Sequence, residues 1–276
     1  MTASSLLIRF KLAFCLLVIS AAACAQPQQG TKEFEPHVGQ AGKDVIWVPT
    51  PQTLVDKMLD MAKVTPNDFL MDLGSGDGRT VITAAKRGAR AMGIEYNPDM
   101  VALSQKNAAA AGVSDRATFA KADLFETDLS KATVITMFLL PDINIKLRPK
   151  ILNLKPGTRV VSNSFTMGDW EADETATVED PGASYWKTAL FWIVPAKVEG
   201  TWKLQQGELQ LKQNYQMVSG ALRNGDRLSP ISGGKLRGDQ ITFTAGNTQY
   251  SGRVTGDSMT GTAQANGSTT SWTAKR

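Results

Sequence analysis

Residues 71–78 read Met71-Asp72-Leu73-Gly74-Ser75-Gly76-Asp77-Gly78, and no other stretch of this chain says as much about its fold. An apolar run, Phe69 to Leu73, leads into this stretch, and a helix-like run, Val81 to Arg87, follows it. A strand, a glycine-rich turn and a helix in this order let a ligand lie against bare main chain. The spacing is G-x-G-x-G, whereas a dinucleotide fingerprint would need glycine at 79, where Arg79 stands.

A second acidic residue favours a nucleoside-type cofactor. Glu95 ends the next apolar run, in Gly93-Ile94-Glu95, 23 positions after Asp72. A carboxylate at that place can accept hydrogen bonds from both hydroxyls of a ribose. The glycine-rich turn by itself has a purely structural alternative. The turn, its strand context and Glu95 together predict a bound cofactor.

Apolar runs alternate with helical patterns before Pro195. A helix is expected to start at Thr50-Pro51, with further helices at about 79–88, 98–111 and 143–152. Strands are expected at 69–73, 91–95, 117–120, 133–138 and 158–164. Two more extended runs, 175–179 and 186–194, are joined by Asp180-Pro181-Gly182 as a closing hairpin. This alternation predicts a parallel α/β sheet with helices on both sides, completed to seven strands.

These features resemble the class I S-adenosylmethionine (SAM) methyltransferases, from about Val48 to Val194. Within that class the chain is similar to a small family of mitochondrial protein-lysine methyltransferases and exported bacterial homologues. Besides the glycine-rich turn and Glu95, the matching segments are Val48-Pro49-Thr50-Pro51, Asp123-Leu124-Phe125, 154–162, and Phe165 with Trp170. The resemblance implies a Rossmann-like seven-stranded sheet, SAM as cofactor and methyl transfer. It does not specify a substrate.

The cofactor-binding residues follow from this resemblance, because ligands of open α/β sheets lie at the carboxyl ends of the strands. It places Glu95 at the ribose and Tyr96 or Asn97 beside the adenine. Asp123, next to Leu124, matches the acceptor of the adenine amine, with a local turn cap as the alternative. The methionine part of SAM would lie beside Asp72, Gly74, Ser75 and Gly76.

The residues that would contact the methyl acceptor are expected in the segment after the fourth strand, Met137 to Asp142. Enzymes that methylate the amines of nucleobases or glutamine carry an (Asn/Asp)-Pro-Pro-(Tyr/Phe) tetrapeptide there, which this chain lacks. Phe138 and its two leucine neighbours would instead form an apolar channel for a slender amine such as lysine. Asp142 is expected either to guide an ammonium or to cap the next helix.

Three more residues are expected to line the opening of this channel: Asn163, Phe165 and Trp170. Phe138, Asp142 and Asn163 are therefore the candidate catalytic residues. No side chain is an obvious base, so the default is deprotonation of the amine by water. Methyl transfer mainly requires donor and acceptor to be held in line with water excluded, and it needs neither histidine nor cysteine.

From Ala196 onward the pattern changes to short β-type runs separated by turn signals such as Asn224-Gly225 and Gly256-Asp257. This pattern predicts a C-terminal all-β antiparallel barrel or sandwich of seven or eight strands. Its aromatic residues would form either a core or a platform that binds an envelope component; they are Trp202, Tyr215, Phe243, Tyr250 and Trp272.

The first 25 residues are typical of an export signal, with Arg9 and Lys11 before an apolar core and Ala23-Cys24-Ala25 before Gln26. The expected domains are a signal peptide at 1–25, a linker at 26–43, a methyltransferase domain at 44–195 and a β-domain at 196–276. The protein would be periplasmic or secreted, or alternatively a lipoprotein anchored at Cys24. A chain starting at Gln26 would have no cysteine and one histidine, His37, which excludes a thiolate metal site.

The formal net charge of +4 falls to +2 without Arg9 and Lys11, which is too small to indicate nucleic acid as a partner. We therefore expect a SAM-dependent methyltransferase that acts on an amine, with protein lysine suggested by resemblance alone. The alternatives are a non-catalytic module that binds SAM or a nucleoside, and a protein that works through its β-domain. Neither the oligomeric state nor the source of SAM follows from the sequence.

Overall fold

The computed structural model of this chain describes residues 34–179, 185–205 and 207–276. The expected export signal, with its alternative lipid site at Cys24, lies outside the described residues, as does Asp180-Pro181-Gly182. Within the described part, no helix combines the length and apolar character needed to cross a membrane.

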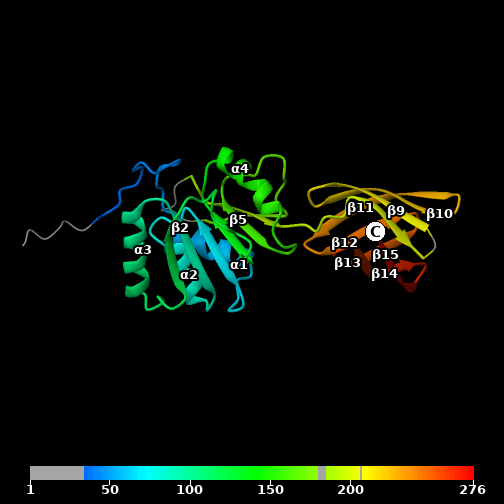
Figure 1. The fold of residues 1–276 in the computed structure, drawn as a ribbon, viewed down its shortest axis with the longest axis horizontal. Coiled ribbons are helices and arrows are strands. Elements are labelled where there is room, and N and C mark those ends of the chain that lie inside the picture. The colour runs from blue at the N-terminus through cyan, green and yellow to red at the C-terminus, as the bar shows by residue number, and fades with distance from the viewer. Residues whose placement is uncertain (1–33, 180–184, 206) are drawn as a thin grey trace, which may run out of the picture. The chain divides into compact units, whose positions relative to one another are not determined.

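A seven-stranded mixed sheet forms the larger domain, with the strand order β3-β2-β1-β4-β5-β7-β6 (Figure 1). The first five strands are parallel, and β7 runs antiparallel to both β5 and β6. The strands are β1 (Phe69–Leu73), β2 (Arg90–Glu95), β3 (Ala117–Lys121), β4 (Val134–Met137), β5 (Arg159–Asn163), β6 (Glu174–Thr177) and β7 (Thr188–Ile193). The predicted methyltransferase sheet is confirmed.

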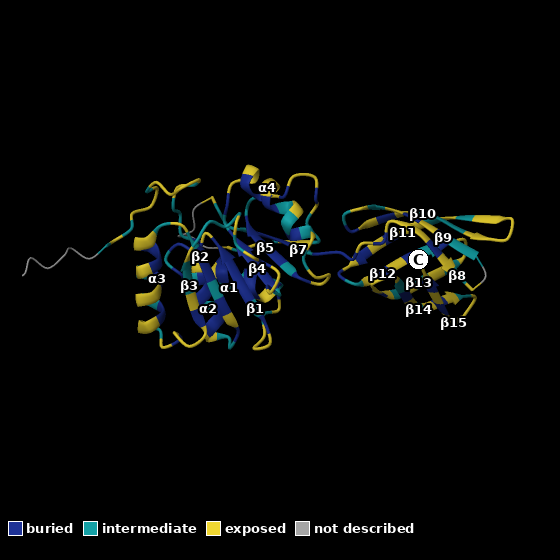
Figure 2. Ribbon diagram, in the orientation of Figure 1, coloured by how far each residue is buried: buried dark blue, intermediate teal, exposed yellow. Residues whose placement is uncertain are grey.

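Helices cover both faces of this sheet, because its central strands bury side chains on each side (Figure 2). The helices are α1 (Gln52–Met61), α2 (Arg79–Lys86), α3 (Pro98–Ala110) and α4 (Pro141–Leu152). Side chains of the first three helices join one hydrophobic core, with Leu70 and Val134 from the sheet. Side chains of α4 join a second core, together with Met71, Trp170 and Trp192.

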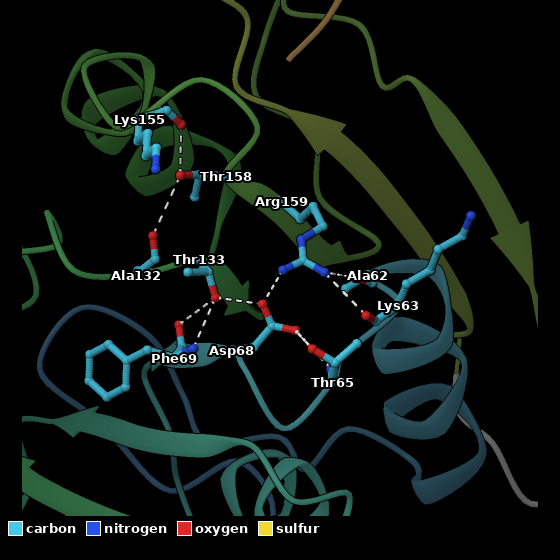
Figure 3. Close-up of polar contacts among 10 residues, drawn as sticks. All are labelled: Ala62, Lys63, Thr65, Asp68, Phe69, Ala132, Thr133, Lys155, Thr158 and Arg159. Carbon is cyan, nitrogen blue, oxygen red and sulfur yellow. Dashed lines mark hydrogen bonds and ion pairs between the residues drawn. The ribbon is translucent and has the colours of Figure 1, made fainter. Parts of the chain in front are cut away.

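A buried polar network ties the sheet together at the amino ends of β1, β4 and β5 (Figure 3). Asp68 accepts hydrogen bonds from the Thr133 hydroxyl at 2.8 Å and the Thr65 amide at 2.8 Å, and it pairs with Arg159. Arg159 also donates to the Ala62 carbonyl at 2.6 Å, just after α1. Burial alone would raise the pKa of Asp68, but its hydrogen bonds and Arg159 outweigh burial and lower that pKa.

The C-terminal domain is a closed barrel of eight antiparallel strands in the order β10-β11-β12-β13-β14-β15-β8-β9. The strands are β8 (Gly200–Leu204), β9 (Gly207–Asn214), β10 (Met217–Asn224), β11 (Arg227–Arg237), β12 (Gln240–Ala245), β13 (Thr248–Thr255), β14 (Ser258–Ala265) and β15 (Ser268–Lys275). Trp202, Phe243 and Trp272 are buried in its core, and Tyr250 packs against that core. These four aromatic residues therefore stabilise the barrel.

The fifth aromatic residue, Tyr215, packs outside the barrel core. Its ring stacks on Trp170 of the larger domain at a centroid distance of 5.9 Å. The neighbouring Gln216 is buried, accepts a hydrogen bond from the Trp170 indole at 3.0 Å and donates to the Glu171 carbonyl at 2.9 Å. These contacts join the two domains through the turn between β9 and β10.

Candidate active site

The parallel strands end at a cavity of about 660 Å³, within the usual size range of small-molecule sites. Its walls include the glycine-rich turn after β1, the end of β2, the turn after β3 and the segment after β4. All the cofactor-binding residues expected from the sequence line this one cavity: Asp72, Gly74, Ser75, Gly76, Glu95, Tyr96, Asn97, Asp123 and Leu124.

The glycine-rich turn needs glycine at Gly76 for two reasons. Its φ of 54° lies in the left-handed region that side chains rarely adopt. A Cβ atom at this position would also lie 2.6 Å from the Trp47 indole nitrogen, which is too close for any real contact. The turn therefore presents bare main chain to the cavity, as a ligand-binding turn requires.

Glu95 links this turn to the end of β2. One carboxylate oxygen accepts the Gly76 amide at 3.0 Å, and the other accepts the Asn97 amide at 2.9 Å. Each oxygen keeps a second lone pair, so the carboxylate can also accept two ribose hydroxyls. Asn97 in turn caps α3, because its side chain accepts the Asp99 amide at 2.9 Å.

Asp72 and Ser75 are buried polar residues whose own contacts leave capacity for a ligand. Asp72 accepts the Thr136 hydroxyl at 2.7 Å, and its burial, together with the charges of Asp77 and Glu95, raises its pKa to about 7. The Ser75 hydroxyl is buried and has no hydrogen-bond partner among the described residues. A cationic ligand would offset the buried negative charge, so this part of the cavity fits the positively charged methionine end of SAM.

Asp123 has two partners in the structure. One oxygen accepts the Phe125 amide at 2.8 Å, which is the local turn cap that the sequence left as an alternative. The other pairs with the Lys43 ammonium, which chiefly accounts for the lowered pKa of Asp123. Lys43 also lies over the Tyr96 ring, 4.8 Å from its centroid. Both sides of the expected adenine site therefore lie together at one end of the cavity.

Of the acceptor-side candidates, Phe138 and Phe165 line the cavity, while Asp142 and Asn163 do not. Asp142 is exposed in the first turn of α4, where an acidic side chain favours the helix dipole. Asn163 is fully buried, donates to the Thr50 hydroxyl at 3.2 Å and accepts from the Ser164 hydroxyl at 2.8 Å. Trp170 lies in the second core and the domain junction. The contacts of Asn163 and Trp170 are structural.

Sequence reasoning missed two parts of the cavity wall. Residues 40–49 line it, although 26–43 was expected to be a linker. This segment forms a small hairpin: the Gly39 amide donates to the Trp47 carbonyl, the Trp47 amide donates to the Gln40 carbonyl, and Ala41 forms a bridge with Ile46. The second missed residue is Trp186, just before β7. The short apolar run Val45-Ile46-Trp47-Val48, just after the expected linker, was the signal that could have pointed to Trp47.

Comparisons with known proteins agree with this site. Residues 72–174 match the family described as the ANTKMT methyltransferase domain. The chain is 47% identical over 153 residues to a protein-lysine N-methyltransferase of Saccharolobus islandicus, covering 54% of this chain and 94% of that protein. It is 36% identical over 119 residues to the adenine nucleotide translocase lysine N-methyltransferase of Mus musculus, covering 42% of this chain and 52% of that protein. The chain thus spans about half of the mouse relative.

Among solved structures, the chain resembles an RNA methyltransferase from Salinibacter ruber in complex with S-adenosyl-L-homocysteine. The identity is 50% and the TM-score 0.51, over 55% of this chain and 96% of that one. The match to almost the whole Saccharolobus islandicus relative, the seven-stranded sheet and the lined cavity agree on one assignment. This chain belongs to the class I SAM-dependent methyltransferases, in the family that resembles the mitochondrial lysine methyltransferases, and SAM is its cofactor.

Proposed function

We propose that this enzyme methylates the ε-amine of a protein lysine. The observation that carries the proposal is the apolar acceptor side of the cavity, formed by Phe138, Leu139, Leu140 and Phe165. A lysine side chain is a slender apolar stem with an amine at its tip, and such walls match the stem. The names of the relatives in Saccharolobus islandicus and Mus musculus, all lysine N-methyltransferases, support the same acceptor.

When bound, SAM supplies a methyl group on a cationic sulfur: the amine lone pair forms the C–N bond, and the C–S electrons stay on sulfur. The residues of this chain have to orient the amine, remove its water and keep it neutral. Burial in apolar surroundings lowers the pKa of an amine and so favours the neutral form that can attack. The displaced proton goes to water, because the apolar residues named above offer no base.

RNA is a second candidate acceptor, favoured by the name of the Salinibacter ruber structure. Against it, the segment after β4 reads Phe138-Leu139-Leu140-Pro141 and lacks the tetrapeptide that holds a planar base amine. A single labelling experiment that offers protein and RNA in parallel distinguishes the two acceptors.

The full chain should be incubated with SAM labelled in its methyl group, and with protein extract and total RNA in parallel. We expect label in the protein fraction, released by acid hydrolysis as methylated lysine. Glu95→Ala is the matched control, because it removes a cofactor contact and leaves the acceptor side unchanged. Label in RNA alone, or in an amino acid other than lysine, would refute lysine as the acceptor.

We further propose that methylation takes place in the cell envelope. The support is the pattern of residues 1–25, with its charged start, apolar core and Ala23-Cys24-Ala25. The basic β-domain, with a net charge of +5 over residues 196–276, suits contact with an anionic envelope surface. N-terminal sequencing of protein from its native host should find Gln26 first, or a lipid-modified Cys24. An intact Met1 in a cytoplasmic fraction would refute the proposal.

A further inference from the structure

We propose that Phe138, Phe165 and Trp186 form the subsite for the acceptor ammonium, and that this subsite accepts amines that already carry methyl groups. The inference rests on the proposed lysine function and deepens it. Its consequence is repeated methylation of one lysine, up to the trimethylated form. Trp186 lies beyond the family match at 72–174, so its role is argued from the geometry alone.

The fold brings these three rings together from three strands. Phe138 follows β4, Phe165 follows β5, and Trp186 precedes β7. The antiparallel pairing of Asn163 with Ala189 puts the start of β7 beside the end of β5. The Phe165 and Trp186 ring centroids lie 4.9 Å apart, and Phe138 lies 5.9 Å and 5.8 Å from them. All three side chains line the cavity.

The three rings are not core residues in the ordinary sense. Each is only half-buried, and none joins the hydrophobic cores found among the described residues. Phe138 is next in the chain to Leu139, whose side chain comes within 3.1 Å of a Cβ position at Gly74 in the glycine-rich turn. An aromatic wall therefore begins where the methionine end of the cofactor is expected.

The carboxylates that line the cavity already have hydrogen-bond or ion-pair partners on the cofactor side. Glu95 accepts two backbone amides, and both Asp123 and Asp44 pair with Lys43. Asp77 binds the Arg79 guanidinium at 2.6 Å, and Asp72 accepts the Thr136 hydroxyl beneath the glycine-rich turn. Recognition of a cation on the acceptor side therefore depends on ring faces.

Ring faces and carboxylates treat methylation differently. A carboxylate holds an ammonium through its N–H groups, and each added methyl removes one of them. A ring face attracts the positive charge itself, needs no N–H, and is the usual partner of quaternary ammonium groups, with Trp the strongest. This wall therefore keeps its attraction for mono-, di- and trimethyl-lysine alike.

The same wall also matches the charge that develops during transfer. Each round forms one N–C bond and moves positive charge to the amine nitrogen, where the rings stabilise it. The mono- and dimethyl products each release one proton to water before the next round, and the trimethyl product has none to release. Repeated transfer thus needs no base from the protein.

The first test compares full-length Trp186→Leu with its matched control Trp186→Phe, which keeps a ring. Hydrolysates from the labelling assay are scored for the ratio of trimethyl- to monomethyl-lysine. We expect the wild type and Trp186→Phe to produce mainly trimethyl-lysine, and Trp186→Leu to lower the ratio roughly 2- to 30-fold, the range of one cation–π contact. S-adenosylhomocysteine affinity, measured by calorimetry, should change less than about twofold. An unchanged ratio in Trp186→Leu would overturn the inference.

The second test measures binding without turnover. With S-adenosylhomocysteine saturating, acetyl-trimethyllysine amide is compared with an isostere in which carbon replaces the quaternary nitrogen. The cation should bind the wild type roughly 2- to 30-fold more tightly, and this preference should vanish in Trp186→Leu. Phe165→Leu is the second variant if Trp186→Leu folds poorly. Equal binding of both probes to the wild type refutes the subsite. A cation preference without methyllysine in the extract refutes the lysine function and leaves the subsite standing.

Discussion

Replacing Asp72 with asparagine should make the protein more stable at neutral and alkaline pH and should lower its affinity for the cofactor. Burial raises the pKa of Asp72 from 3.8 to about 7. Because the folded state binds the proton more tightly than the unfolded state, stability is fully present below the unfolded pKa and is lost as the pH rises to about 7. Asparagine is neutral throughout and can still accept the Thr136 hydroxyl.

The magnitude follows from that pKa. A rise of about three units corresponds to roughly 4 kcal/mol of unfolding free energy, spread over pH 4 to 7. For a domain of this size, each kcal/mol moves the melting temperature by about 2–4 °C. Asp72→Asn should therefore melt up to roughly 8–16 °C above the wild type at pH 8.5, with the difference shrinking toward pH 4.

The assay is thermal unfolding of the wild type and the variant between pH 4.5 and 8.5, without and with SAM. The difference in unfolding free energy should grow by about 1.4 kcal/mol per pH unit and become constant above pH 7. SAM should bind the variant roughly 1.5–3 kcal/mol more weakly, because a charged partner is lost. A difference that does not vary with pH would show that Asp72 is not a buried, uncompensated acid and would refute the reasoning.

Three further predictions follow from other contacts. Glu95→Ala should weaken SAM binding by roughly 1.5–3 kcal/mol and should also lower the melting temperature, because the Gly76 and Asn97 amides lose their acceptor; calorimetry that finds unchanged affinity would exclude the ribose role. Asp68→Asn should cost roughly 1.5–3 kcal/mol of stability by removing the charge that pairs with the partly buried Arg159, which keeps its bonds to the Ala62 and Lys63 carbonyls. Because the pKa of Asp68 is lowered, that cost should shrink in melts as the pH falls below about 4; a cost that persists at low pH would contradict the charge argument. A fragment of residues 26–195 should bind SAM but melt at a lower temperature than the full chain, because it loses the contact of Gln216 with Trp170. Gln216→Ala in the full chain is the control for this loss. Equal melting temperatures of the fragment and the full chain would show that the junction adds no stability.

Local pattern was enough to predict most of the cofactor half of the site. The turn around Gly76 joins a strand to the helix that follows it, and Glu95 ends the next strand, so short-range periodicity and spacing place both. Parallel strands share one edge for their carboxyl ends, which puts these residues at one cavity without further information. The Gly76 and Asn97 amides, which both donate to the Glu95 carboxylate, hold the turn and the end of β2 together at that cavity.

The sequence by itself thus determined the sheet and the existence of a separate β-domain, because both depend on contacts between neighbouring elements, and the resemblance to the methyltransferases indicated the cofactor. Only the tertiary structure decided that Trp47 covers Gly76, that Trp186 joins Phe138 and Phe165, and that Asn163 is buried and bonded to Thr50. The physical reason is chain separation. These contacts join segments far apart in the sequence, and their geometry depends on the twist and packing of the whole sheet, which periodicity does not encode.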